Sequence, residues 1–226
     1  MTSICFIFFI NNGPEIILLG TLKKLKRHDA VIKPSIGGSH WPDGIVPYEI
    51  NEQLPFANKL SILQAIDHWQ QNSHLKFVEI NYQNKDQFQD YLSFIPAPGT
   101  TCSSFVGKQK GKQEILLSPR CTMMITAHEI GHALGLWHEQ SRADRDLFIQ
   151  ILWDNIEDNH SYNFDQHLSD GDDFGAYDYQ SIMHYGPYAF SKNGQPTIIP
   201  LIEGVEIGQR RRLSEKDIAV INAMYP

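Results

Sequence analysis

The sequence has few cysteines, no long apolar run and a shortage of positive charge. Only 3 of its 226 residues are cysteine, which excludes a cysteine-dense miniprotein. Glycine and proline are present in ordinary numbers and form no repeat, which excludes collagen-like chains. A hydrophobic content of 42% is typical of a folded protein rather than a disordered one. The length fits one large domain, or two closely associated subdomains that share a cleft.

Basic residues are outnumbered by acidic ones. The 19 Lys and Arg against 26 Asp and Glu give a net charge of −7. Because such a surface does not attract a phosphate backbone without a strong basic patch, we expect no nucleic-acid partner. The first thirty residues differ from the rest: they have a net charge of +2, which comes from the basic run Lys23–Arg27.

The apolar run Ile4–Ile10 covers seven residues. A membrane-spanning helix needs roughly 20, so we expect no stable membrane insertion. A signal peptide is poorly supported, because no basic residue precedes the run and no small-x-small cleavage site follows it. A strand and the remnant of a longer leader are the alternatives. Residues 13–40 then form a connector to the main domain.

Strand-like and helix-like segments alternate from residue 45 onward. Two β-rich runs, Ile45–Ile50 and Leu75–Ile80, flank a predicted helix over 55–73. The apolar residues of that helix recur at mostly helical spacing: Leu60, Ile62, Leu63, Ile66 and Trp69. Three further strands are expected at 91–95, 103–106 and 114–117, with a polar loop at 107–113.

Two more helices are predicted, over 123–137 and 214–224, and the residues from 144 to the last helix form aromatic-rich loops. Ser214 and Asp217 are spaced as a capping box for the final helix. The order of elements predicts an α+β fold. It has a twisted, mixed five-stranded sheet with two long helices, followed by a loop-rich half that ends in a helix.

Residues 128–139 read HEIGHALGLWHE. On a helix His128 and His132 are one turn apart, so their imidazoles converge on a point where a tetrahedral Zn²⁺ can bind. Glu129 lies on the neighbouring flank, placed to contact a metal-bound water rather than the metal, as a general base must be. Gly135 lets the chain leave the helix, and the turn brings His138 back as a third ligand. Three protein ligands leave one position open, as in a catalytic zinc site.

An isolated histidine on a helix face is usually satisfied by hydrogen bonds rather than by a metal. Here five fixed letters occur in one register, which chance produces with a probability under about 10⁻⁴ at roughly one in twenty per position. Three neutral imidazoles suit zinc, one ion per chain, although Co²⁺ or Cu²⁺ could occupy the same geometry.

The extended pattern H-E-x-x-H-x-x-G-x-x-H resembles that of the metzincin metalloproteases. Glu139, directly after the third histidine, is similar to the astacin family in particular. Ser181–Tyr185 (SIMHY) resembles the Met-turn of that family. The similarity runs from Trp41 to Tyr225, about four-fifths of the chain, and includes the segments 102–107, 139–146, 207–210 and 213–222.

This resemblance implies a zincin-like metzincin catalytic domain over 34–226. Its upper subdomain would be 34–135 and its lower subdomain 136–226, with the active-site cleft between them. Residues 1–33 would be a leader or a shortened propeptide-like segment. In the family a new N-terminus is buried near Glu139 after processing, and in this chain that start would fall at about residues 30–33.

The resemblance also implies roles for single residues. His128, His132 and His138 would bind zinc, and Glu129 would be the general base and proton shuttle. Met183 would form a hydrophobic floor under the metal. Tyr185 would be a movable outer ligand that stabilises the oxyanion, a role that suits a phenol. Composition alone would have placed Met183 and Tyr185 in the core.

The expected function is that of a secreted, extracellular zinc metalloendopeptidase acting on protein or peptide substrates. An extended substrate would pair with the sheet edge near Ser103–Val106. Arg210–Arg212 are candidates for favouring an acidic residue after the scissile bond, and a solvated loop face is the alternative for them. The alternative functions are a catalytically silent peptide-binding module, a latent zymogen and a hydrolase of non-peptide amides. The oligomeric state is left open.

The resemblance to the astacin family implies a disulfide between two of the three cysteines. Cys102 and Cys121 match a disulfide of the family, which would form only in an oxidising compartment. The second family bridge is expected to be absent, because His74 occupies the position of one of its cysteines. Cys5 is left over, either as a small hydrophobe or as an inhibitory metal ligand.

Overall fold

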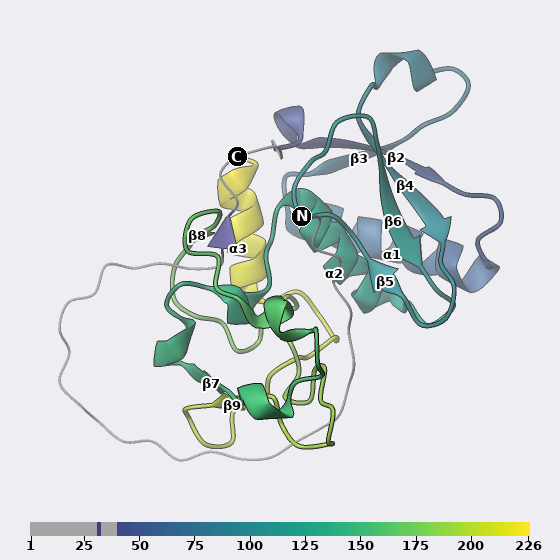
Figure 1. Cartoon of the computed structure of the whole chain (residues 1–226). Coiled ribbons are helices and arrows are strands. Elements are labelled where there is room, and N and C mark those ends of the chain that lie inside the picture. The colour runs from purple at the N-terminus through teal and green to yellow at the C-terminus, as the bar shows by residue number, and fades with distance from the viewer. Residues whose placement is uncertain (1–30, 33–39) are drawn as a thin grey trace. The chain divides into compact units, whose positions relative to one another are not determined.

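The computed structural model describes residues 31–32 and 40–226 (Figure 1). These residues group into two compact units, one reaching Leu136 and including Ile218–Pro226, the other containing Trp137–Asp217. The apolar run Ile4–Ile10, Cys5 and nearly all of the predicted leader lie outside the described residues. The predicted subdomains, which divide after residue 135, and the cleft between them stay predictions.

The first unit is built on a five-stranded sheet in the order β3-β2-β4-β6-β5. Strands β3, β2, β4 and β6 run parallel to one another, whereas β5 is antiparallel to β6. The prediction of a mixed five-stranded sheet is therefore confirmed. The strand bounds are β2 Ile45–Ile50, β3 Lys76–Glu79, β4 Tyr91–Pro96, β5 Cys102–Ser103 and β6 Lys112–Leu117.

The edge strand β5 and its neighbour β6 differ from their predicted bounds. Strand β5 ends at Ser103 instead of Val106, because the chain then turns toward the second helix, where the Gly107 N–H donates to the carbonyl of His132 at 2.8 Å. Strand β6 begins at Lys112, inside the stretch predicted as a loop. The Gly111 N–H donates to Asp90 at 2.6 Å, which fixes the start of β6 beside β4.

Helix α1 (Phe56–Asn72) and helix α2 (Met123–Leu134) lie against the sheet (Figure 1). Ile62, Ile66 and Trp69 form the buried stripe of α1. The Trp69 indole N–H donates to the carbonyl of Ala127 in α2 at 3.0 Å, which joins the two helices. Leu60 and Leu63, which also follow the helical spacing, are exposed.

Short strands and single turns make up most of the second unit. Strand β1 (Val31–Ile32) pairs antiparallel with β8 (Asp172–Asp173), and β7 (Ile149–Ile151) pairs antiparallel with β9 (Ile198–Pro200). These strands were not predicted, because two or three residues show no periodicity. The loop-rich character of this part of the chain is confirmed. Between residues 40 and 226, no helix has both the length and the apolar character needed to cross a membrane.

Helix α3 (Glu215–Met224) begins with the predicted capping box. The Ser214 N–H donates to Asp217 Oδ2 at 2.8 Å, and the Asp217 N–H donates to Ser214 Oγ at 2.9 Å. Each side chain thus satisfies a backbone donor that the first turn leaves without a helical partner.

The disulfide Cys102–Cys121 links β5 to the segment before α2, across a sequence separation of 19. We expect the double variant Cys102→Ser, Cys121→Ser to lose about 3 kcal/mol of unfolding free energy, because the open loop gains chain entropy in the unfolded state. Urea unfolding measures the loss. Reductant should bring the wild type to the midpoint of the variant and leave the variant unchanged, and equal midpoints without reductant would contradict the expectation.

Candidate metal centre

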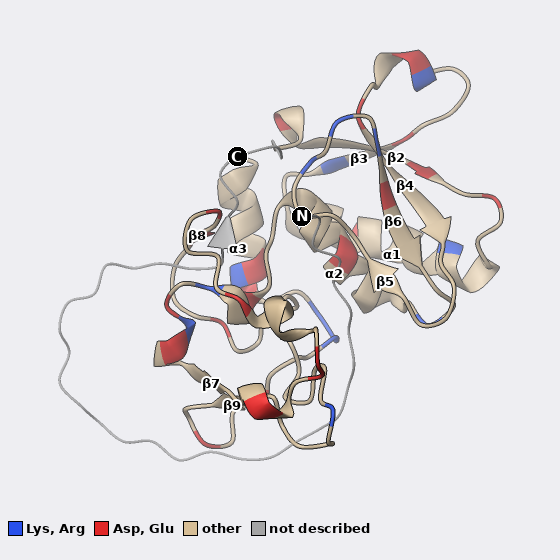
Figure 2. Cartoon of the chain, in the orientation of Figure 1, with Lys and Arg blue, Asp and Glu red and all other residues tan. Residues whose placement is uncertain are grey.

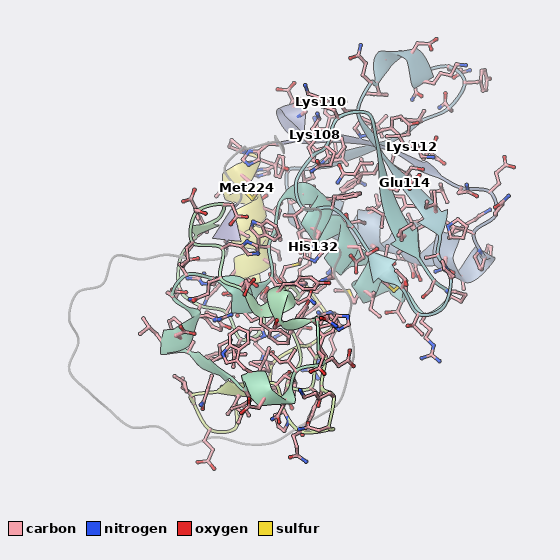
Figure 3. The ribbon with its side chains drawn as sticks, viewed as in Figure 1. Lys108, Lys110, Lys112, Glu114, His132 and Met224 are labelled. Atoms are coloured by element: carbon pink, nitrogen blue, oxygen red, sulfur yellow. A yellow bond between two sulfur atoms is a disulfide. The ribbon has the colours of Figure 1, made fainter. Side chains whose placement is uncertain are left out.

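Helix α2 carries three of the predicted site residues within five positions. His128, Glu129 and His132 are fully buried, and the two imidazole centroids lie 4.6 Å apart. This proximity follows from the one-turn spacing of residues i and i+4 on a helix. Figure 3 labels His132 within the structure.

The orientation of His132 is set by the turn that follows the helix. Its Nδ1 lies 2.8 Å from the carbonyl oxygen of Leu136. Because a carbonyl can only accept, Nδ1 carries the proton, and Nε2 keeps its lone pair for a metal. A hydrogen bond of this kind is the usual means of orienting a histidine ligand.

Gly135 ends the helix with a Schellman motif. Its φ is +115°, its N–H donates to the His132 carbonyl at 2.9 Å, and the Leu136 N–H donates to the Gly131 carbonyl at 3.0 Å. The helix therefore stops at Leu134, before the predicted end at Trp137. The early stop turns the chain back, so that His138 approaches the other two histidines.

Side chains from distant parts of the first unit hold the last carbonyls of α2. The Trp41 indole N–H donates to the Ala133 carbonyl at 3.0 Å, and the Tyr225 hydroxyl donates to the Leu134 carbonyl at 2.7 Å. Helix-end carbonyls have no partner inside the helix. These two bonds supply partners and fix the point at which the chain turns toward His138.

One ring nitrogen from each of His128, His132 and His138 lies within 4.8 Å of the others, and all three residues are buried. Zinc binds imidazole nitrogen at about 2.0–2.1 Å, so small side-chain adjustments suffice for one ion to reach all three. The ligand set holds no thiolate or carboxylate, which also fits zinc. The predicted triad is thus positioned to bind a zinc ion.

The segment Ser181–Tyr185, called the Met-turn below, lies beside the third histidine. The Tyr185 ring centroid is 4.2 Å from that of His138, and the Glu139 N–H donates to the Met183 carbonyl at 3.3 Å. Tyr185 is buried, with an exposed fraction of 1%. Met183 is also buried, and its place beneath the metal stays a prediction.

Asp217 has a second role besides the capping box. Its carboxylate accepts from the Ser181 hydroxyl at 2.7 Å and from the Ile182 N–H at 2.9 Å, so it joins the start of α3 to the Met-turn. Burial raises the pKa of Asp217 to about 6, although these hydrogen bonds favour its charged form. Sequence reasoning missed this role, because the partners are 36 residues apart.

Four further contacts hold the end of the Met-turn. Gln140 Oε1 accepts from the Tyr185 N–H at 3.0 Å, and His184 Nδ1–H donates to the Tyr185 carbonyl at 2.7 Å. Burial lowers the pKa of His184 to about 4, so its Nε2 carries no proton and accepts from the Tyr177 hydroxyl at 2.7 Å. Arg210 Nη1 donates to the His184 carbonyl at 3.0 Å.

The three arginines of the run Arg210–Arg212 differ in their surroundings. Arg210 is half-buried and supports the Met-turn, whereas Arg211 and Arg212 are exposed. A role of the run toward acidic substrate residues stays a prediction.

Two glycines meet where the Met-turn ends. A Cβ on Gly208 would lie 2.3 Å from the Cα of Gly186 and 3.0 Å from the carbonyl carbon of Tyr185. The φ of Gly208 is +78°, which is a second reason for glycine at this position. The backbone at Gly208 therefore packs directly on the backbone of Tyr185 and Gly186.

Glu139 is a buried carboxyl next to the third histidine. Burial raises its pKa to about 8, although Arg142 at 3.5 Å and the Asp178 N–H at 2.7 Å favour the charged form. The new N-terminus expected near Glu139 falls at residues 30–33, of which the structure describes only Val31 and Ile32, in β1.

Comparison with known proteins gives one family. A family model described as Astacin, a peptidase family, matches residues 35–226. Zinc metalloproteinase nas-13 of Caenorhabditis elegans is 41% identical over 188 residues, 82% of this chain and 40% of that protein. Meprin A subunit beta of Homo sapiens is 36% identical over 227 residues, 97% of this chain and 31% of that protein. The chain thus spans less than half the length of either relative.

Solved structures agree with the family match. High choriolytic enzyme 1, a hatching enzyme zinc-protease from Oryzias latipes, superposes with a TM-score of 0.74 at 32% identity, covering 86% of this chain and 98% of that one. Myroilysin superposes with a TM-score of 0.53 at 20% identity, covering 83% of this chain and 95% of that one. This second similarity shows the fold alone.

Because Gly208 packs on Gly186, we expect that adding one methyl group at position 208 destabilises the fold strongly. We expect Gly208→Ala to lower the unfolding free energy by about 3 kcal/mol, through left-handed strain of about 1–2 kcal/mol and overpacking of about 1–3 kcal/mol. Urea unfolding of the zinc-loaded protein measures the change.

Gly194→Ala is the matched control for this prediction. Gly194 has a φ of +74° and no atom within 4 Å of an added Cβ, so only the strain of about 1–2 kcal/mol applies. Equal losses in the two variants would show that the packing of Gly208 on Gly186 does not stabilise the fold.

Proposed function

Since this chain belongs to the astacin family of zinc metalloendopeptidases, we propose that it hydrolyses peptide bonds of extended protein substrates at the centre formed by residues 128–138. The observation that carries the proposal is the meeting of three buried imidazoles, two of them flanking Glu129 on α2. The substrates and the place of action of the whole protein are part of this proposal.

His128, His132 and His138 hold the zinc ion. When bound, zinc supplies a Lewis acid that polarises the scissile carbonyl and makes water more acidic. The hydrogen bond from His132 Nδ1–H to the Leu136 carbonyl keeps the other nitrogen of that ring unprotonated for this purpose. The histidines themselves transfer no proton in this scheme.

Glu129 is the proposed general base. Its carboxylate takes a proton from the attacking water and passes it to the nitrogen of the leaving amine. Support comes from its position on α2, in the same turn as two ligands and fully buried. A buried carboxylate interacts strongly with nearby charge, because little water screens it.

Tyr185 is the proposed oxyanion donor. Its phenol can donate a hydrogen bond to the oxygen that becomes negative as the carbonyl is attacked. Support comes from its ring contact with His138 and from the contacts of Gln140 and His184 with its backbone. These backbone contacts fix the point from which the phenol extends.

An extended substrate would add to the sheet at β5. This strand ends the order of the five-stranded sheet and pairs only with β6 among the described residues. Backbone hydrogen bonds to such an edge bind a peptide with little dependence on its sequence. The disulfide Cys102–Cys121 supports a secreted protein, because disulfides persist in oxidising compartments.

The alternatives have less support. A silent binding module would be indicated by the loss of Glu129 or of a ligand, and all four residues are present. A hydrolase of non-peptide amides shares the zinc site but has no need of a sheet edge that can pair with a peptide. A latent form would depend on residues 1–33, and stays a prediction.

Cleavage of casein tests the mechanism. We expect Glu129→Ala to lower the rate by at least about 100-fold, because a general base contributes about 10²–10⁴-fold. A chelator should abolish wild-type activity, and added zinc should restore it. Glu203→Ala, which removes an exposed carboxylate, is the control and should match the wild type. Activity that survives both Glu129→Ala and chelation would refute the mechanism.

Tyr185→Phe tests the oxyanion role. We expect kcat to fall about 10²–10³-fold with little change in KM or zinc content, because the lost hydrogen bond forms mainly in the transition state. Steady-state kinetics on a fluorogenic peptide measures both constants. Tyr162→Phe, at an exposed tyrosine, is the control. An unchanged kcat in Tyr185→Phe would remove Tyr185 from the catalytic residues.

A further inference from the structure

A cavity of about 140 Å³ lies at the edge of the five-stranded sheet. It is lined by Ser103, Ser104, Phe105, Glu114 and Leu116. Three of these residues belong to β5 and the segment that follows it, and two belong to β6. The cavity is therefore next to the strand with which a substrate would pair.

The alternation of β6 explains where the cavity forms. Gln113, Ile115 and Leu117 are buried on one face of the strand, whereas Glu114 is exposed and Leu116 half-buried on the other. The register pairs Ser103 with Leu116, so Ser103 shares the face of Glu114. Cys102 is paired with Leu117 and belongs to the opposite face.

The lining combines apolar walls with one charged group. Phe105 and Leu116 supply the walls, the two serines leave space because their side chains are short, and Glu114 is the charged residue among the five. At roughly 30 Å³ for each water-sized group, the volume takes about four or five heavy atoms. One long side chain has about this number of heavy atoms.

The charge of Glu114 is only partly offset by its neighbours. Lys112 lies 3.7 Å from Glu114 and also 3.7 Å from Glu49, so one ammonium serves two carboxylates. All three side chains are more than a third exposed, and exposed pairs of this kind attract weakly. Figure 3 labels Lys112 and Glu114, and Figure 2 shows acidic and basic residues on β6. Lys108, in the preceding loop, is paired with Asp90.

We propose that this cavity is a subsite for a lysine or arginine side chain of the substrate. The aliphatic stem packs on Phe105 and Leu116, and the cationic end reaches the carboxylate of Glu114. The net charge of −7 adds a general attraction for basic substrates. The inference rests on the proposed peptidase function, because it requires a substrate strand beside β5.

The substrate preference should appear at a single position of the peptide. Side chains that share a face of an extended strand lie about 7 Å apart, so a cavity of about 140 Å³ takes the side chain of only one residue of a bound peptide. A scan of positions therefore separates this subsite from a general attraction to basic peptides, which would act at all positions alike.

The test uses fluorogenic peptides that carry one lysine, placed in turn at each position on both sides of the scissile bond. Matching peptides carry norleucine, which has a similar shape without the charge. The measured quantity is the ratio of kcat/KM for lysine over norleucine. We expect a ratio of about tenfold at one position for the wild type, a ratio near one for Glu114→Gln, and a ratio below one for Glu114→Lys.

Glu49→Gln is the matched control, because Glu49 lies at the same 3.7 Å from Lys112 and its loss changes the net charge equally. It should keep the tenfold ratio. Equal ratios at all positions, or the same fall in Glu49→Gln as in Glu114→Gln, would overturn the subsite while the peptidase function stands. No cleavage of any peptide by the wild type would instead refute the proposed function, and the subsite with it.

Discussion

The end of helix α2 is the constraint on which the metal centre depends. Two ligands one turn apart need only a helix, but at a rise of about 1.5 Å per residue a continuing helix would place His138 about 15 Å along the axis from His128. The left-handed residue Gly135 reverses the chain instead, and hydrogen bonds from Trp41 and Tyr225 fix the place of reversal. The metal site thus depends on residues from both ends of the described chain.

A polar network, rather than apolar packing alone, holds the Met-turn. Asp217 serves at once as the capping residue of α3 and as the acceptor for Ser181 and Ile182. Gln140, directly after Glu139, holds the backbone of Tyr185. Since these buried donors and acceptors are paired with one another, the backbone of Tyr185 has one well-specified position. A proposed oxyanion donor needs such preorganisation, because it must not spend free energy on finding its place during the reaction.

Local patterns predicted what depends on nearby residues. The histidine triad, the capping box and helix α1 follow from spacing over one to three turns, and the structure has them at the expected positions. Contacts between distant segments could not be predicted in this way. The second role of Asp217, the packing of Gly208 on Gly186 and the short β5 all depend on residues far apart in the sequence. Spacing also does not tell which apolar residues are buried: Leu60 and Leu63 are exposed, because an apolar residue on a helix need not face the core.

The central claim is that the turn after α2 brings His138 to a zinc ion held by His128 and His132. Its most direct test is the zinc content of purified wild type and His138→Gln, measured by mass spectrometry after dialysis against a mild chelator. The account predicts close to one zinc per chain for the wild type and almost none for the variant, with both proteins folded by circular dichroism. Equal zinc content in the two proteins would contradict it.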